Sequence, residues 1–196
     1  MREISPALSL TPDEFLETLP KEVRCLVAKM RLEKRIGARR LPSSLLIDKS
    51  SLLTSKMRQS ILDKAASLVD ENLTGRADMC TQFAQLISRT LLEVKIPCRV
   101  VMGNAIYYAN GEKVFSWDHA WVRAGEEVID ANVDSLDENP LVPTSVRINP
   151  YWGPVSDVPN DRRLRENSGI QCPIDPDVES IWWPEMREWV ESLGEA

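Results

Sequence analysis

Three residues in the middle of the chain could together form a thiol-based catalytic site. Cys80 opens a segment with helical periodicity, His119 is the only histidine, and Asp130 ends an apolar run. An imidazole can take the proton of a thiol near neutral pH, and a carboxylate can fix the tautomer of that imidazole. The order of Cys, His and Asp therefore predicts a nucleophile, its base and an orienting acid.

Each of the three residues also has a purely structural interpretation. Cys80 alone could be a buried thiol, His119 a hydrogen-bonded histidine near the surface, and Asp130 the last residue of a strand. Their joint occurrence in this order, on elements that could bring them together, is what favours catalysis. One histidine and no CxxC pair do not fit the common zinc sites, so we expect neither a metal nor another cofactor.

The element that must position Cys80 follows from the spacing of apolar residues. A buried helix is predicted from Asp78 to Val94, because apolar residues recur there at helical intervals, at Phe83, Ala84, Ile87, Leu91 and Val94. Asp78 would cap this helix and place Cys80 in its first turn. The positive end of the helix dipole would favour the thiolate form of Cys80 there.

An antiparallel meander is predicted to carry the other two residues. Strand-like runs cover 99–102, with a continuation through 108, then 114–123 and 127–129. Hairpin turns are indicated between them by Asn110-Gly111 and Ala124-Gly125.

Side-chain alternation on the second strand separates the neighbours of His119. His119 shares one face with Phe115, Trp117 and Trp121, whereas Asp118 points to the other. Asp130, at the end of the neighbouring strand, can reach across to the imidazole, which makes it the expected partner. Trp117 is a candidate substrate contact, with core packing as its alternative role.

The flanking segments differ in character from this core. Helices are predicted from Thr11, over 20–36 and over 52–69, and a short helix begins at Pro184 with Met186, Trp189 and Val190 on one face. Prolines punctuate the region after Asp134, which we interpret as loop-rich.

The predicted fold class is α+β, with N-terminal helices and the nucleophile helix packed on an antiparallel sheet. We expect one domain over 1–196. Its parts are an N-terminal helical part (1–70), a catalytic core (71–136) and a Pro-rich extension with a C-terminal helix (137–196).

Two aromatic residues of the extension are further candidate substrate contacts. Tyr151 and Trp152 lie between prolines in the run 149–154. Prolines lower the entropy lost when a loop is ordered, so this run could hold a fixed shape without regular secondary structure. We expect one of the two rings to border the Cys80 cleft. The alternative is that Trp152 fills an apolar gap in the core.

Composition limits the environment and the partners. The chain has 196 residues, is 43% hydrophobic and carries a net charge of −6, which argues against a nucleic-acid partner. The basic run 31–40 is interpreted as a solvated helix end and loop. No signal peptide and no membrane-spanning run is predicted.

The cysteines indicate a reducing compartment. Four cysteines are too sparse for a disulfide scaffold, so we expect the cytoplasm. Cys25 and Cys98 are expected to be small buried thiols, and the state of Cys172 is left open.

Three motifs in order resemble the transglutaminase-like superfamily. The first joins Met79–Leu86, Leu91-Leu92 and Ile96–Gly103; the second is His119–Val122; the third is Val128–Asn132. The resemblance covers about 73–134 and fits compact bacterial-type members. It implies a papain-like site with Cys80 as nucleophile, His119 as base and acid, and Asp130 as orienting group. It also implies an acyl-enzyme formed at an amide or ester carbonyl.

The motifs depart from the family pattern at several positions. The family usually has glycine before the nucleophile and before Ile-Pro, where this chain has 77–79 and Lys95. The third motif continues as Ala131-Asn132 rather than as Asp-Pro-Thr. The backbone N–H of Cys80 is the only oxyanion donor that we can name.

The leading functional hypothesis is a cysteine hydrolase, a peptidase or amidase, acting on a peptide or another amide. One alternative is acyl transfer to an amine, since both reactions use one acyl-enzyme. The other is a binding module of the same fold with an inert triad. Peptide N-glycanases, arylamine N-acetyltransferases and calcium-dependent animal transglutaminases do not fit, because their signature residues are missing. The oligomeric state is not predicted.

Overall fold

The computed structural model describes residues 17–26, 41–72, 76, 78–138, 142 and 147–194. Backbone contacts divide the chain into two units, Met1–Arg39 and Arg40–Ala196. In the first unit, residues 21–26 are helical, within the predicted helix 20–36. The predicted helix start at Thr11 and the basic run 31–40 lie outside the described residues. The single-domain organisation stays a prediction.

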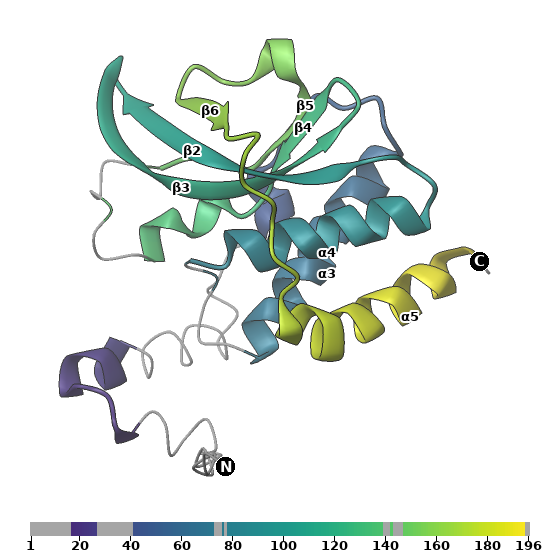
Figure 1. Cartoon of the computed structure of the whole chain (residues 1–196), viewed down its shortest axis with the longest axis horizontal. Helices are drawn as coiled ribbons and strands as arrows, with labels where there is room; N and C mark the ends of the chain where they lie inside the picture. Colours follow the sequence, from purple (N-terminus) through teal and green to yellow (C-terminus); the bar gives the residue numbers. More distant parts are fainter. Residues whose placement is uncertain are drawn as a thin grey trace, which may run out of the picture. The chain divides into compact units, whose positions relative to one another are not determined.

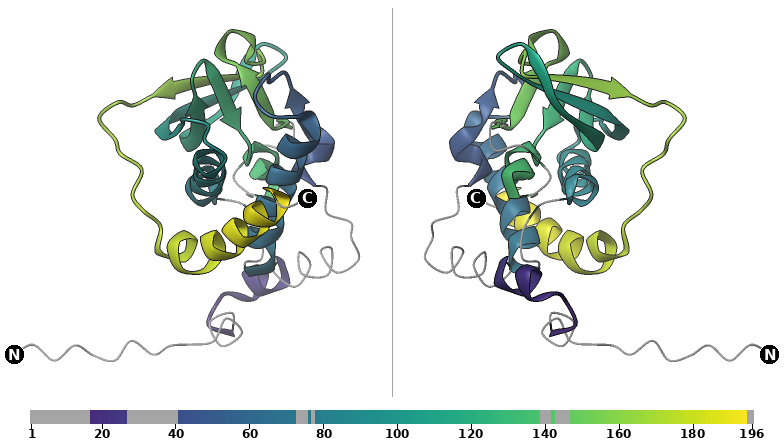
Figure 2. Two further views of the ribbon diagram at one scale, coloured as in Figure 1. Left: turned by 90° about the vertical axis from the view of Figure 1, so that its right-hand side faces the viewer. Right: turned by 90° about the vertical axis from the view of Figure 1, so that its left-hand side faces the viewer.

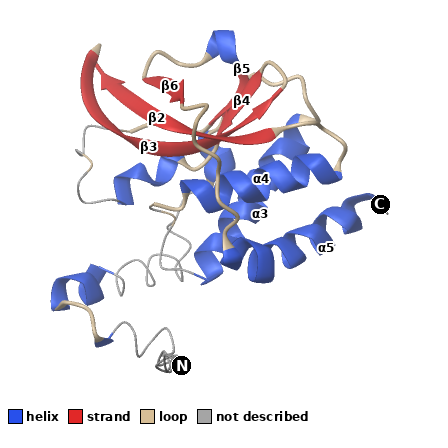
Figure 3. Ribbon diagram, in the orientation of Figure 1, coloured by secondary structure: helices blue, strands red, loops and turns tan. Residues whose placement is uncertain are grey.

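The second unit has the α+β architecture that the sequence predicts. Helix α4 packs on a six-stranded mixed sheet, and helices α3 and α5 pack on α4 (Figures 1 and 3). The helices are α3 (Ser55–Asn72), α4 (Cys80–Glu93) and α5 (Trp183–Gly194). The strands are β1 (Ile47–Asp48), β2 (Arg99–Ala109), β3 (Glu112–Ala124), β4 (Glu127–Asp130), β5 (Tyr151–Pro154) and β6 (Arg162–Glu166).

Helix α4 lies at the centre of the main core. Its buried apolar residues include Phe83, Leu86, Ile87 and Leu91, close to the predicted stripe. They pack with the helix-facing residues of β3, which are Ala120, Val122 and Ala124, and with parts of α3 and α5. The run from Phe83 to Ser88 is buried on all sides of the helix, so packing from several elements fixes α4 in place.

The start of α4 differs from the prediction. The N-cap is Met79 and it makes no side-chain capping bond, so the assignment of Asp78 as N-cap is wrong. Asp78 instead adopts a left-handed backbone with φ of 61°. That conformation precludes the extended geometry of an N-cap, and it turns the chain so that the helix begins at Cys80.

The end of α4 has the hydrogen bonds of a Schellman motif. The N–H of Ile96 binds the carbonyl of Leu91 at 2.8 Å, and the N–H of Lys95 binds that of Leu92 at 3.0 Å. Lys95 has a φ of 64°, the left-handed conformation that this motif requires.

The meander β2–β3–β4 is antiparallel, as predicted. Asn110 and Gly111 both have positive φ, 54° and 81°, which matches a type I′ hairpin turn. Gly125, with φ of 58°, turns the chain between β3 and β4. Strand β2 runs without interruption to Ala109, so the continuation through residue 108 is confirmed.

Outside the meander, the predicted sheet was incomplete. The strand order of the observed sheet is β1-β5-β4-β3-β2-β6. Because β1 pairs with β5 in parallel, the prediction of a purely antiparallel sheet is wrong. The segment 151–154 is strand β5 rather than an irregular loop. Flanking prolines suggested a loop, but they stand at the ends of this short strand, where few ladder bonds are lost.

The sheet is strongly coiled. Arg162 of β6 forms an ion pair with Asp130 of β4 at 2.8 Å, although β2 and β3 lie between these strands. At about 4.8 Å between neighbouring strands, a flat sheet would separate β6 from β4 by roughly 14 Å. An arginine side chain cannot span that gap, so the sheet must curl, as the long bent strands β2 and β3 show in Figure 1.

Gly103, the last residue of the first motif, is required by this close packing. A Cβ atom there would lie 2.1 Å from the carbonyl oxygen of Arg165 and 2.7 Å from the indole of Trp121. Only a glycine lets β6 and the Trp121 ring approach β2 this closely.

Candidate active site

Cys80 is the first residue of α4 and is half-buried. The N–H groups of the first helical turn have no partner within the helix, so the N–H of Cys80 is free of intrahelical bonding. The thiol interacts with the His119 ring, with the backbone N–H of Ala120 and with the Thr81 side chain. The candidate nucleophile therefore lies at a helix N-terminus, as the sequence predicts.

His119 and Asp130 form a buried hydrogen-bonded pair. The His119 Nε2 atom lies 2.8 Å from Asp130 Oδ1, and the two residues are 1% and 0% exposed. The second ring nitrogen, Nδ1, is buried and makes no hydrogen bond of good geometry. Because Nε2 is committed to Asp130, Nδ1 is the ring atom left for the Cys80 thiol.

The two competing acids are placed elsewhere. Asp134 forms a buried ion pair with Arg76 at 2.5 Å, and Asp118 is exposed on the opposite face of β3. The predicted contact between His119 and Asp130 is thus confirmed. The catalytic role of the three residues remains a prediction.

The end of a strand ladder brings the three residues together. The pairing of β3 with β4 covers only residues 122–124 of β3, and β4 ends at Asp130. His119 and Ala120 therefore lie just beyond the ladder, where the N–H of Ala120 meets the Cys80 sulfur. The first turn of α4 thus packs against a free stretch of strand edge within the described part of the sheet.

Electrostatics favour a thiolate–imidazolium pair. Burial lowers the pKa of His119, but the charge and hydrogen bond of Asp130 and the Cys80 thiol outweigh it and raise the pKa to about 10. Burial raises the pKa of Cys80, but the hydrogen bond and charge of His119, with the Ala120 and Thr81 contacts, bring the pKa below its usual 9.0.

Asp130 stays ionised although it is fully buried. Burial raises the pKa of its carboxyl group, whereas the charges and hydrogen bonds of His119 and Arg162 lower the pKa to about 2. A buried carboxylate with two cationic partners keeps its charge over the whole neutral range. It can therefore stabilise an imidazolium without accepting the proton.

Arg162 is a functional candidate that sequence reasoning missed. Its Nη1 atom lies 2.8 Å from Asp130 Oδ2, and its other nitrogens bind Asp161 and the carbonyl of Asn149. The residue is 2% exposed. It stands in the run 162–166, where three arginines look like ordinary surface charges, so composition gave no sign of its burial.

The third motif also anchors the segment before Cys80. Asn132 Nδ2 donates to the carbonyl of Arg76 at 2.9 Å, and Asn132 Oδ1 accepts from Arg76 Nη1 at 3.2 Å. Ser135 donates to the same carbonyl. The residues that follow Asp130 thus hold the chain four residues before the nucleophile, which gives the departure at Asn132 a structural reason.

The two missing glycines have a conformational counterpart. Asp78, within the region 77–79, and Lys95 both have left-handed backbones, in the two regions where the resemblance would lead us to expect glycine. The chain therefore keeps the backbone geometry that glycine favours, with other residues in place. Asp tolerates this region better than Lys, because its short side chain bonds locally.

An aromatic row runs through the site on the face of His119. The rings of Tyr107, Phe115, Trp117, His119 and Trp121 follow one another with centroid separations of 5.6–6.5 Å. Trp117 is half-buried and its ring stacks on His119 at 6.2 Å. The predicted shared face is confirmed, and Trp117 lies next to the catalytic candidates.

Tyr151 and Trp152 are placed inside the fold. Both are fully buried in strand β5, and Trp152 belongs to the main core. Tyr151 donates a hydrogen bond to the carbonyl of Pro154. The structure gives Trp152 the packing role that the sequence left as its alternative, and neither ring is exposed to a substrate.

The other thiols have distinct surroundings. Cys25 is exposed, so its predicted burial is wrong. Cys98 is half-buried and its S–H donates to the carbonyl of Ser88. Cys172 accepts a bond from Gln85 of α4, and the charge of Cys80 acts on it. All four thiols are free.

The segment that carries Cys172 crosses the first turns of α4. Gln85 donates to the carbonyl of Pro173 at 2.7 Å and accepts from the N–H of Asp175, while Gln82 donates to the Asp175 carboxylate. This segment connects β6 to α5, and Figure 2 shows its long path beside the sheet. A cavity of about 490 Å³ lies between it, α4 and β2, with Gln85 and Cys172 in its wall.

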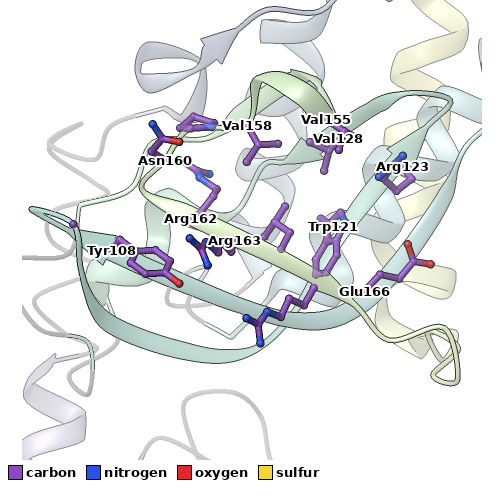
Figure 4. A pocket seen from close by; sticks show the side chains of 14 residues that line it. Tyr108, Trp121, Arg123, Val128, Val155, Val158, Asn160, Arg162, Arg163 and Glu166 are labelled. Carbon is purple, nitrogen blue, oxygen red and sulfur yellow. The ribbon is translucent and has the colours of Figure 1, made fainter.

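A second cavity of about 740 Å³ lies beside β6 (Figure 4). Trp121, Val128 and Leu164 contribute to its wall, as does Arg162, the partner of Asp130. Neither Cys80 nor His119 lines it. This cavity therefore reaches Arg162 but not the Cys80 thiol.

Metal and membrane features are lacking in the described residues. No group of three or more His, Cys, Asp and Glu side chains is arranged to hold a metal ion there. None of the helices in the described ranges combines the length and the apolar character needed to cross a bilayer.

Comparisons with known proteins give no assignment for this arrangement. No family model, no curated protein and no solved structure matches the chain.

Proposed function

We propose that this chain is a transglutaminase-like cysteine hydrolase that cleaves an amide bond through an acyl-enzyme on Cys80. One observation carries the proposal. The His119 imidazole is held at 2.8 Å by the buried Asp130 carboxylate, and its other nitrogen is left for a thiol at a helix N-terminus. A thiol, an imidazole and a carboxylate in this order support papain-like chemistry, with Cys80 as nucleophile, His119 as base and Asp130 as orienting acid.

Acylation would begin with the Cys80 thiolate. The sulfur attacks the carbonyl carbon, a C–S bond forms, and the carbonyl electron pair moves to the oxygen. The N–H of Cys80 points from the positive end of α4 and can donate to this oxyanion. The imidazolium of His119 then gives its proton to the leaving amine as the C–N bond breaks.

Deacylation would use the same groups in reverse roles. Neutral His119 takes a proton from water, and the resulting hydroxide attacks the thioester carbonyl. The C–S bond breaks, the acid product leaves, and the proton on His119 restores the thiolate–imidazolium pair. Asp130 holds the ring orientation in both steps, and Arg162 holds Asp130.

The backbone at the motif positions gives further support. Asp78 and Lys95 adopt the conformation that glycine favours, in the two regions, 77–79 and Lys95, where the family motif usually has glycine. Asn132, which replaces the usual residue of the third motif, ties the nucleophile segment to the Asp130 strand. The departures from the family pattern are thus compatible with its local geometry.

An activated ester tests the proposal without knowledge of the natural substrate. We expect p-nitrophenyl acetate to release p-nitrophenolate in a rapid first turnover, with an acetyl group on the Cys80 peptide found by mass spectrometry. Cys80→Ala should abolish both signals, and the matched variant Cys98→Ala should keep them. Acetylation spread over other thiols, or turnover by Cys80→Ala equal to the wild type, would refute the proposal.

The same assay separates the two acyl acceptors. If the enzyme is a hydrolase, acetate should remain the main product when a primary amine such as glycinamide is added. If most of the acetyl group appears on the amine at low amine concentration, the enzyme is an acyltransferase rather than a hydrolase. If Cys80 is not acetylated at all, the site is an inert binding module.

A further inference from the structure

The cavity of about 740 Å³ beside β6 has an apolar wall that reaches the surface (Figure 4). Val155 is 39% exposed in this wall, and Val158 and Leu164 are half-buried. Trp121 and Val128 form its buried part. A cavity of several hundred cubic ångströms with this kind of lining is typical of small-molecule sites. The reaction proposed above does not involve it.

Unpaired positive charge gathers along the same cavity, although the whole chain carries a net charge of −6. Arg123 of β3 lines it, as do Arg163 and Arg165 of β6. Within the part of the chain that the structure describes, these arginines form no ion pair, and Arg163 instead lies over the Tyr108 ring. Cations without counterions around one hollow raise its potential and attract anions.

The other charged residues of the lining are already paired. Glu166 binds Arg99 at 2.7 Å. Arg162, which is 2% exposed, binds Asp130 and Asp161, each at 2.8 Å. The charge that remains for a ligand is therefore positive.

Arg123 is the cation best placed for direct contact. It follows Trp121 by two residues on β3 and pairs with Val128 of β4, so its side chain shares their face of the sheet. Its Nε atom is buried and has no hydrogen-bond partner among the described residues, and its Nη2 atom reaches the Gly125 carbonyl at 3.4 Å. A buried donor without an acceptor carries a desolvation cost, which an anionic oxygen would remove.

Arg163 and Arg165 act at longer range. They alternate with Leu164 along β6, so their side chains start from the opposite face of that strand. Both are exposed. They therefore add positive potential beside the cavity rather than a contact within its apolar wall.

The apolar wall decides which anion fits. An apolar body would remove Val155, Val158 and Leu164 from water, and one carboxylate would satisfy Arg123. An inorganic anion would leave the apolar wall uncovered. An acidic peptide would lay its polar backbone against that wall, which costs free energy unless each group finds a partner.

We propose that the cavity beside β6 binds a small organic anion, with its apolar body against Leu164 and Val155 and its carboxylate on Arg123. This site goes beyond the proposed function and does not depend on it. The ligand would not contact Cys80, which does not line the cavity.

The Trp121 ring links this site to the only histidine of the chain. It lines the cavity and also stacks on the His119 ring, with the centroids 6.1 Å apart. A molecule bound against Trp121 would change the surroundings of His119. The single imidazole resonance in proton NMR therefore reports occupancy of this cavity.

Octanoate and 1-octanol test the assignment on the full chain, because they share an apolar body and differ in charge. We expect isothermal titration calorimetry to give saturable one-site binding of octanoate, with 1-octanol at least about 10-fold weaker. Octanoate should shift the His119 resonance with the same Kd. No saturable binding of octanoate up to about 10 mM, or equal affinity for 1-octanol, would overturn the proposal.

Substitutions in the wall locate the carboxylate. Arg123→Gln should raise the Kd for octanoate by about 10-fold, the effect of one charge-assisted hydrogen bond. Arg187→Gln removes the same charge from α5, where Arg187 pairs with Glu191, and should leave the Kd at the wild-type value.

A second pair of variants keeps the test decisive if Arg123→Gln does not fold. Val155→Glu adds a carboxylate to the exposed part of the wall and should abolish saturable binding by repulsion. Val155→Gln has nearly the same size without the charge and should weaken binding much less. Circular dichroism shows whether each variant is folded.

Other outcomes contradict the site or its ligand class. Binding that Arg123→Gln and Val155→Glu leave unchanged, or that does not move the His119 resonance, would place octanoate elsewhere. Tighter saturable binding of a hexaglutamate peptide than of octanoate would make this face a peptide surface. Each of these results overturns the proposal.

The proposed function fails separately. If Cys80 is not acetylated by p-nitrophenyl acetate but octanoate binds as described, only the hydrolase is refuted. If Cys80 is acetylated and octanoate does not bind, only the anion site is refuted.

Discussion

Asp130 is held between two cations, and this arrangement sets the charge of His119. The carboxylate binds His119 through Oδ1 and Arg162 through Oδ2, each at 2.8 Å. The sequence indicated the first contact because His119 and Asp130 lie on neighbouring predicted strands. It could not indicate the second, because Arg162 approaches only when β6 curls over the sheet.

The single histidine makes its protonation directly measurable. We expect the one imidazole resonance in proton NMR to titrate near pH 10 in the wild type, since Asp130 raises the pKa of His119. Asp130→Asn removes the carboxylate charge, so the midpoint should fall towards the usual 6.5. A wild-type midpoint near 6.5 would show that the pair does not exist in solution.

Loss of Arg162 should be costly because it is buried with its partner. Arg162→Met leaves Asp130 with His119 alone, and we expect a loss of about 3–5 kcal/mol in the free energy of unfolding. The neighbouring Arg163 is exposed, and its guanidinium group lies over the Tyr108 ring. Arg163→Met should change stability by about 0.5 kcal/mol or less. Urea unfolding compares the two, and equal effects would contradict the buried network.

At the scale of elements, local pattern predicted the parts with strong periodicity. Helix α4 and the β2–β4 meander were recognisable, because apolar residues recur at the spacing of a helix or a strand and the turn at Asn110-Gly111 has a specific chemistry. Strands β1, β5 and β6 were not. They have two to five residues, and their pairing depends on distant segments rather than on local sequence.

The end of α4 offers a stabilising substitution. Lys95 is exposed and has a left-handed backbone, which destabilises the fold by about 1–2 kcal/mol when the residue has a Cβ atom. We expect Lys95→Gly to raise the free energy of unfolding by about 1 kcal/mol. Leu92→Gly, at an exposed position inside the helix, should lower it by about 1 kcal/mol. Thermal denaturation measures both, and destabilisation by Lys95→Gly would contradict the Schellman geometry.

For the whole molecule, coiling of the sheet is what assembles the site. It brings β6 across to β4 and encloses the aromatic row, and no local pattern encodes that curvature. The same long-range packing explains why the sequence did not reveal the burial of Tyr151 and Trp152. Their flanking prolines suggested a loop, whereas the sheet takes them up as a buried strand.

Trp152 should therefore matter for stability rather than for turnover. Trp152→Ala removes a fully buried ring from the main core, and we expect a loss of about 3–5 kcal/mol. The specific activity of the folded fraction with p-nitrophenyl acetate should remain close to that of the wild type. Stability kept together with a large loss of turnover would place Trp152 at the cleft after all.

The reactivity of the four thiols against pH tests the central claim most directly. Alkylation by iodoacetamide, followed by peptide mapping, gives a rate for each thiol. We expect Cys80 to react fastest and its rate to level off at a lower pH than an ordinary thiol, because the pKa of Cys80 is lowered. The pKa values of Cys98 and Cys172 are raised, chiefly by burial, so they serve as internal controls.

The variant His119→Asn should move the Cys80 profile to higher pH, since the charge and hydrogen bond of the imidazolium are lost. That result, with Cys80 the first thiol to react in the wild type, is what the account predicts. Faster labelling of Cys98 or Cys172, or a Cys80 profile that His119→Asn leaves unchanged, would contradict it.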